Sequence, residues 1–263
     1  MTTILDKILA AKKGQVEQML LRSIPDQLEI ITRPSLFEAL YQTEKLQVIS
    51  EIKRASPSKG LIAEGIIPTD QASKYANAGA ACISVLTDTP FFQGTFDDLA
   101  EVASTVSIPI LCKDFIIHPI QIDHAKHAGA SVILLIVAAL KQEKLLSLYE
   151  YTVSKGLEVL VEVHDSVELD RALQLDAKLI GVNNRDLRTF QVDLSRTAEI
   201  AANFPFEEKR VLISESGIWN AMDASKVANY GASAVLVGES LMRSGDVQNA
   251  LQSLQVQREV ITS

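Results

Sequence analysis

The chain has few of the residues that build disulfide frameworks and metal centres. Its 263 residues include 2 cysteines and 4 histidines. Cys82 and Cys112 lie inside separate apolar runs without a CxxC spacing, which argues against a disulfide framework or a zinc knuckle. No HExxH motif or Cys/His cluster accompanies the histidines. We therefore expect a protein of a reducing, cytoplasmic compartment that has no metal site.

Long apolar segments and an excess of positive charge are also missing. No run of about eighteen apolar residues is present that could span a bilayer, and the N-terminal residues carry charges throughout, unlike a signal peptide. The net charge of -8 repels polyanions, and the chain has no basic, aromatic-rich patch. We therefore expect no membrane or nucleic-acid partner, whereas a local cationic pocket could still hold a small phosphorylated molecule.

Short apolar runs recur along the chain after about residue 47. Several are nearly continuous, which is typical of parallel strands that are covered on both faces. Helix-like stretches with a glycine stop, such as 68–79 and 119–129, lie between them. The eight runs that we interpret as strands are 48–52, 81–86, 109–112, 131–137, 157–163, 178–182, 211–214 and 234–238.

This alternation of strand and helix predicts the fold class. It favours an α/β fold, the (β/α)8 TIM barrel, with a doubly wound open sheet as the alternative. No linker, low-complexity tract or charge block divides the chain. We therefore expect residues 1–263 to form a single (β/α)8 barrel domain, with residues 1–47 as an N-terminal helical extension. Apolar residues at positions 4, 5, 8 and 9 predict an amphipathic helix there, and the oligomeric state is left open.

Polar and charged side chains follow almost every predicted strand. The carboxyl ends of barrel strands meet at one mouth, where catalytic groups gather. Glu51 and Lys53, two residues apart, project to the same side of an extended chain. Lysines and glutamates are rarely buried without partners, so we expect one site here rather than separate solvated strand ends. Other polar residues that close strands are Thr87, Asp88, Asp114, His164, Asn184 and Ser240. The remaining candidates for the site are Lys113, Glu162, Asn183, Arg185, Glu215, Ser216, Gly217, Gly238 and Glu239.

Two further features indicate the kind of substrate. Ser216-Gly217 and Gly238-Glu239-Ser240 follow the last two strands, where backbone amides of such barrels commonly bind phosphate. Phe92 and Phe115 follow the second and third strands. They could stack on an aromatic substrate, or they could pack in the core or in a lid.

Six ordered motifs between about residues 4 and 250 resemble those of the indole-3-glycerol-phosphate synthase family. The resemblance implies a barrel with an N-terminal helical extension and a place in tryptophan biosynthesis. It also implies conversion of 1-(2-carboxyphenylamino)-1-deoxyribulose 5-phosphate to indole-3-glycerol phosphate with loss of carbon dioxide and water, and we expect no cofactor. The motifs are Glu51-Ile-Lys53-Arg54-Ala-Ser56-Pro57-Ser58-Lys59-Gly60, Lys113-Asp114-Phe115, Leu160-Val-Glu162-Val-His164, Ile180-Gly-Val-Asn183-Asn184-Arg185-Asp186-Leu187, Ser214-Glu215-Ser216-Gly217-Ile218 and Leu236-Val-Gly238-Glu239-Ser240-Leu241-Met242.

Roles for individual residues follow from the same resemblance. Ring closure needs a cationic acid near the substrate's ketone, and Lys113 matches the family's catalytic lysine. Lys53 would act as a second acid or anchor the substrate carboxylate, and Glu162 would act as the base, with the division of these later roles left open. Glu51, Asn183, Arg185, Glu215 and Ser216 would bind or orient the substrate. Ser56, Gly217, Gly238 and the Glu239 backbone would hold the phosphate, and Phe92, Phe115, Leu134 and Leu236 would surround the aromatic ring.

Two other functions fit the same residues. A barrel lysine among carboxylates also suits a Schiff-base aldolase, and a barrel without activity could bind a phosphorylated metabolite. The net direction in which the lysine pKa values shift is open as well. Neighbouring lysines lower the pKa of a lysine, whereas neighbouring carboxylates raise it.

Overall fold

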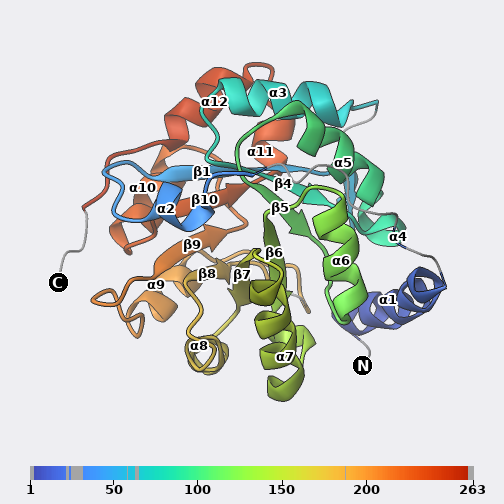
Figure 1. The fold of residues 1–263 in the computed structure, drawn as a ribbon. Coiled ribbons are helices and arrows are strands. Elements are labelled where there is room, and N and C mark those ends of the chain that lie inside the picture. Colours follow the sequence, from blue (N-terminus) through green and yellow to red (C-terminus); the bar gives the residue numbers. More distant parts are fainter. Residues whose placement is uncertain are drawn as a thin grey trace.

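Eight parallel strands close into a barrel at the centre of the molecule (Figure 1). The computed structural model describes residues 3–21, 24, 32–57, 59–62, 65–186 and 188–259. The barrel strands are β1 (Gln47–Ile52), β4 (Cys82–Leu86), β5 (Ile110–Lys113), β6 (Val132–Ile136), β7 (Glu158–Val163), β8 (Leu179–Asn183), β9 (Val211–Glu215) and β10 (Ala234–Val237). Each strand pairs with the next in chain order, and β1 pairs with β10 to close the ring. All eight predicted strands are confirmed to within one residue at each end.

Helices surround the barrel and cover the outer faces of its strands (Figure 1). They are α3 (Pro68–Asn77), α5 (Phe96–Thr105), α6 (Pro119–His127), α7 (Gln142–Ser154), α8 (Ser166–Leu173), α9 (Ser195–Ala201), α10 (Ala221–Asn229) and α12 (Val247–Leu254). The helices predicted at 68–79 and 119–129 are α3 and α6, and each is followed by a glycine with positive φ, Gly79 or Gly129. No helix within the described ranges is long and apolar enough to cross a membrane.

Several shorter elements lie in the loops, and the sequence did not predict them. They are α4 (Thr89–Phe92), α11 (Glu239–Met242), the 3-10 turn Val137–Ala139, and the antiparallel hairpin of β2 (Ala55–Ser56) and β3 (Gly60–Leu61). All of them follow directly from the end of a barrel strand or lie just beyond it. They therefore shape the mouth at the carboxyl ends of the strands.

Alternating side chains divide the core into two apolar layers. Residues such as Ile49, Leu111 and Leu160 face the inside of the barrel, whereas Val48 and Cys112 belong to the layer between strands and helices. Cys112 therefore points away from the barrel axis and is a packing residue. This alternation also determines which residues form the site. The side chains that point inward are apolar within the barrel and charged at its mouth.

The N-terminal extension contacts both ends of the barrel. At the bottom, Leu36 and Leu40 of α2 (Leu36–Leu40) are fully buried against the barrel interior. The Glu158 carboxylate fixes this helix, because it accepts hydrogen bonds from the backbone N–H groups of Leu36 and Phe37 at 2.6 and 3.0 Å. At the mouth lies α1 (Ile4–Leu20), which packs beside α6 (Figure 1).

Candidate active site

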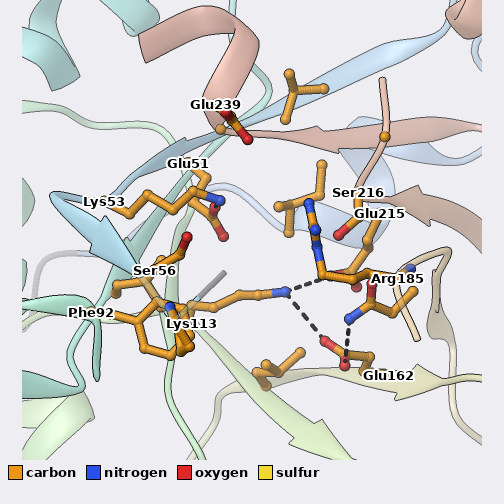
Figure 2. Close-up of a pocket in the computed structure, with 18 of the residues that line it drawn as sticks. Glu51, Lys53, Ser56, Phe92, Lys113, Glu162, Arg185, Glu215, Ser216 and Glu239 are labelled. Carbon is orange, nitrogen blue, oxygen red and sulfur yellow. Dashed lines mark hydrogen bonds and ion pairs between the residues drawn. The ribbon is translucent and has the colours of Figure 1, made fainter. Parts of the chain in front are cut away.

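One pocket opens at the carboxyl ends of the barrel strands, with an empty volume of about 1190 Å³ that includes the space at its mouth. Every residue that the sequence singled out for the site lines this pocket (Figure 2). They are Glu51, Lys53, Ser56, Phe92, Lys113, Phe115, Leu134, Glu162, Asn183, Arg185, Glu215, Ser216, Gly217, Leu236, Gly238 and Glu239.

Strand parity brings the charged residues together. Glu51, Lys113 and Glu162 each stand two residues beyond an inward-facing apolar residue on the same strand, so they point into the barrel axis. Glu215 continues the inward row of β9 in the same way. The side chains consequently converge above the apolar interior, where little water surrounds them.

Lys113 lies between two carboxylates on the floor of the pocket (Figure 2). Its Nζ is 2.5 Å from Glu215 Oε2 and 3.3 Å from Glu162 Oε2. Burial alone would lower the pKa of the ammonium, but the charges of Glu215, Glu162 and Glu51 outweigh it and raise the pKa above its ordinary value. The carboxylates thus decide the direction that the sequence left open, and Lys113 is a cation.

The two carboxylates around Lys113 differ in their own ionisation. Burial raises the pKa of Glu215 to about 7 despite the neighbouring lysine, and its Oε1 is buried without a hydrogen-bond partner among the described residues. Burial also opposes ionisation of Glu162, but Lys113 and His164 lower its pKa below the ordinary value, as does a hydrogen bond from Asn183. One carboxylate of the pair therefore ionises more readily than the other.

Neighbours on β8 and beyond β7 orient Glu162. Asn183 Nδ2 donates to Glu162 Oε1 at 3.1 Å, while Asn183 Oδ1 accepts from the Arg185 backbone N–H at 3.0 Å. The imidazole of His164 lies between Glu162, at 3.4 Å, and Glu168, at 3.0 Å. Burial lowers the pKa of this imidazole, but the two carboxylates raise it by a larger amount, so the pKa of His164 lies above its ordinary value. His164 supports Glu162 from behind and does not line the pocket.

A second lysine pairs with a carboxylate across the pocket. Lys53 Nζ is 2.5 Å from Glu51 Oε1, which agrees with the expectation that the two share one side of the strand. Gly238 permits this arrangement, because a Cβ at that position would stand 2.5 Å from Glu51 Oε1 and 3.1 Å from Lys53 Nζ. The ammonium of Lys53 therefore lies against the glycine that follows β10.

One of the two expected phosphate-binding segments has a left-handed backbone conformation. Ser216 and Gly217 both have positive φ, at 67° and 83°, and a side chain at Gly217 would collide with Val192. At the start of α11, Glu239 pairs with Arg243 at 3.2 Å through its Oε1. This ion pair gives the Glu239 carboxylate a partner on its own helix.

Apolar side chains form the remaining wall. The rings of Phe92 and Phe115 lie 6.0 Å apart at an angle of 32°. Leu134 and Leu236 belong to the barrel interior and reach the pocket from below. Together these four side chains offer a surface suited to a planar aromatic group.

Several pocket residues were missed by the reasoning from sequence. Ile4, Leu5 and Ile8 of α1 reach the pocket, and so do Phe190 and Trp219 from the loops after β8 and β9. The only signal for α1 is its amphipathic pattern, which does not say what the apolar face covers. Trp219 directly follows the Ser-Glu-Ser-Gly-Ile motif, and that position was a usable hint.

Metal-binding side chains do not cluster within the described ranges. Within them, no group of three or more histidine, cysteine, aspartate or glutamate side chains could hold a metal ion. In the pocket, lysines pair with glutamates: Lys113 with Glu162 and Glu215, and Lys53 with Glu51.

Comparison with known proteins decides the family. The family model described as indole-3-glycerol phosphate synthase matches residues 5–254. The chain belongs to this family. It is 48% identical over 254 residues to the indole-3-glycerol phosphate synthase of Oceanobacillus iheyensis, covering 97% of both chains. It is also 48% identical over 256 residues to that of Bacillus cereus strain G9842, covering 97% of this chain and 99% of the relative.

Solved structures with little sequence similarity share the barrel fold. One is a thiamine phosphate pyrophosphorylase from Pyrococcus furiosus, with a TM-score of 0.59 and 16% identity over 84% of this chain and 96% of that one. Another is an N-acetylmannosamine-6-phosphate 2-epimerase from Clostridium perfringens, with a TM-score of 0.61 and 14% identity over 83% of this chain and 93% of that one.

Proposed function

We propose that this pocket carries out the family's reaction, with Lys113 as the first proton donor. Family membership makes the chain a carboxy-lyase of tryptophan biosynthesis that forms indole-3-glycerol phosphate from 1-(2-carboxyphenylamino)-1-deoxyribulose 5-phosphate. The observation that carries the assignment of Lys113 is the position of its ammonium, which lies between Glu162 and Glu215 in the same pocket as the apolar wall.

Ring closure sets the first chemical demand. The ring carbon that bears the carboxylate attacks the ketone carbon, and the ketone oxygen gains a proton as it becomes a hydroxyl. Lys113 supplies that proton, because its carboxylate neighbours keep it charged until a more basic alkoxide develops. Loss of carbon dioxide then returns the bonding electrons to the ring and restores aromaticity.

Dehydration sets the second demand. The new hydroxyl leaves as water after it takes a proton from an acid, and a base removes a proton from the neighbouring CH2 carbon. Glu162 suits the base, because Lys113 and Asn183 favour its ionised form. Lys53 suits the acid or the anchor of the substrate carboxylate, since Glu51 and Gly238 hold its ammonium at the pocket wall.

Binding of the substrate uses the rest of the lining. The backbone around Gly217 and Gly238, the start of α11 at Glu239 and the Ser56 hydroxyl hold the phosphate, next to the positive charge of Lys53. Phe92, Phe115, Leu134 and Leu236 hold the anthranilate ring. Arg185 and Ser216 add polar contacts, and the unpartnered Glu215 Oε1 is an acceptor for a substrate hydroxyl.

The test is turnover of the carboxyphenylamino-deoxyribulose phosphate by the purified chain, with a chelator present, followed by indole fluorescence. We expect saturable turnover. Saturable binding without any product would favour the non-catalytic metabolite-binding barrel. Borohydride trapping of a covalent adduct on Lys113 or Lys53 would favour the Schiff-base aldolase.

Compartment and domain organisation belong to the same proposal. Cys82 and Cys112 are both free and buried, which suits the reducing cytoplasm. The packing of α1 against α6 and of α2 against the barrel interior supports a single domain. Recovery of the protein in a membrane or extracellular fraction, or separate unfolding of the extension, would contradict this.

A further inference from the structure

A buried lysine of the N-terminal extension lies outside the pocket and is not used by the reaction described above. The Lys12 side chain is only 2% exposed, and its Nζ lies 2.7 Å from Asp88 Oδ2 and 2.6 Å from Asp114 Oδ1. Both carboxylates are 1% exposed. A long cationic side chain is rarely buried this deeply, so the contact has a specific cause.

Both aspartates stand where a barrel strand turns into a loop of the site. Asp88 Oδ1 accepts the backbone N–H of Phe91 at 3.0 Å and caps α4, the short helix that carries Phe92. Asp114 directly follows Lys113, and its Oδ1 accepts the backbone N–H of Phe115 at 2.7 Å. The two carboxylates therefore fix the loops that present the aromatic wall and the end of the strand that presents Lys113.

The same face of α1 forms part of the pocket wall. Ile4, Ile8 and Lys12 follow one another at intervals of four residues, so they share one face of the helix. Ile4 and Ile8 line the pocket, while Lys12 pairs with Asp88 and Asp114. The ion pairs of Lys12 therefore join this helix face to the loops at the mouth.

Two aspartates at this depth need a cationic partner. An isolated buried carboxylate is costly, and removing the partner of a buried ion pair leaves that cost uncompensated. Burial by itself would lower the pKa of Lys12, but Asp114 and Asp88 raise it above the ordinary value, so the lysine stays charged. The triad is thus one electrostatic unit made from three separate segments of the chain.

We propose that Lys12 is a positioning residue for the reaction: it ties α1 to the loops after β4 and β5, and so fixes Phe92, Phe115 and Lys113 for ring closure. This inference rests on the proposed function. Lys12 itself touches neither the substrate nor the reacting atoms.

The first experiment compares Lys12→Met with the matched control Lys13→Met, whose side chain is exposed, in the full chain. Misplaced catalytic groups slow chemistry sharply. We expect kcat of Lys12→Met to fall by at least about tenfold, and the control to keep the kcat and KM of the original. Inhibition by inorganic phosphate should change little in either variant, because its site involves no group that Lys12 contacts.

A second variant separates positioning from stability. Combining Lys12→Met with Asp88→Asn and Asp114→Asn leaves no uncompensated charge, and the asparagine side chains can still cap the loop backbones. We expect this triple variant to recover thermal stability lost by Lys12→Met, yet to keep a kcat several-fold below the original. Its lower kcat would then come from the missing tie to α1.

Either of two results would overturn the proposal. One is a normal kcat for Lys12→Met at a temperature where it is folded. The other is a normal kcat for the triple variant, which would make Lys12 a structural residue only. Absence of turnover in the unmodified chain would instead contradict the proposed function, so the two failures are distinguishable.

Discussion

Two lysines of this barrel each lie between two carboxylates, and they differ in what else they face. Lys12 is closed in by Asp88 and Asp114. Lys113 lies between Glu162 and Glu215, but its side chain is 13% exposed and lines the pocket. A lysine between two carboxylates thus has a structural role at Lys12 and acts as a proton donor at Lys113, because only Lys113 lines the pocket.

The partners of the two lysines differ in the same sense. Asp88 and Asp114 also accept hydrogen bonds from backbone N–H groups, which fix their carboxylates in place. Glu215 keeps an unpartnered Oε1 in the described structure, and its pKa lies near 7. The group of Lys113, Glu162 and Glu215 is therefore suited to proton exchange. In the Lys12 triad, each charged side chain is already paired with another.

The largest difference should appear when each lysine is replaced by methionine. Lys113→Met removes the proton donor for ring closure, so we expect kcat to fall by about 10³-fold or more. The substrate Kd should change far less, since the phosphate and ring contacts remain. Rapid-quench kinetics and equilibrium titration measure the two quantities. A Lys113→Met enzyme no slower than Lys12→Met would erase the distinction between the triads.

Glu162→Gln tests the later half of the reaction. If Glu162 is the base for dehydration, carbon dioxide should still be released, while indole formation slows by about 10²-fold. Single-turnover assays, with enzyme in excess over substrate, follow carbon dioxide release and indole fluorescence as two separate steps. Equal loss of both products would move the role of Glu162 to ring closure.

Glu215→Gln should change how stability depends on pH. Burial raises the pKa of Glu215 from 4.5 to about 7, so its neutral form favours folding below about pH 4.5 and this advantage is lost as the pH rises through 7. The glutamine variant lacks that loss. Relative to the original, it should therefore gain on the order of a few kcal/mol in unfolding free energy between these pH values.

Urea unfolding at several pH values measures this gain, and Glu207→Gln, at an exposed carboxylate, is the control. A constant difference between the original and Glu215→Gln across the range would show that Glu215 has an ordinary pKa.

The smallest expected effect concerns the phosphate. Ser56→Ala removes one hydrogen-bonding hydroxyl, which typically contributes about 1 kcal/mol or somewhat more toward a charged group. We expect KM to rise several-fold with little change in kcat. Ser253→Ala on the exposed part of α12 is the matched control. An unchanged KM would remove Ser56 from the phosphate site.

The strands and the pocket floor were predictable because they depend on local patterns. Buried parallel strands require continuous apolar runs, and parity then decides that Glu51 and Lys53 point inward. The Lys12 triad was not predictable, because residues 12, 88 and 114 meet only through the packing of α1 on the mouth. The direction of the Lys113 pKa shift also needed geometry, since it depends on how closely each carboxylate approaches.

A crystal structure with the substrate's alcohol analogue, in which the reacting ketone is reduced, tests the central claim most directly. We expect the new hydroxyl within hydrogen-bonding distance of Lys113 Nζ, the aromatic ring against Phe92 and Phe115, and the phosphate at Gly217 and Gly238. An analogue bound with that hydroxyl far from Lys113 would contradict the assignment of Lys113 as the proton donor.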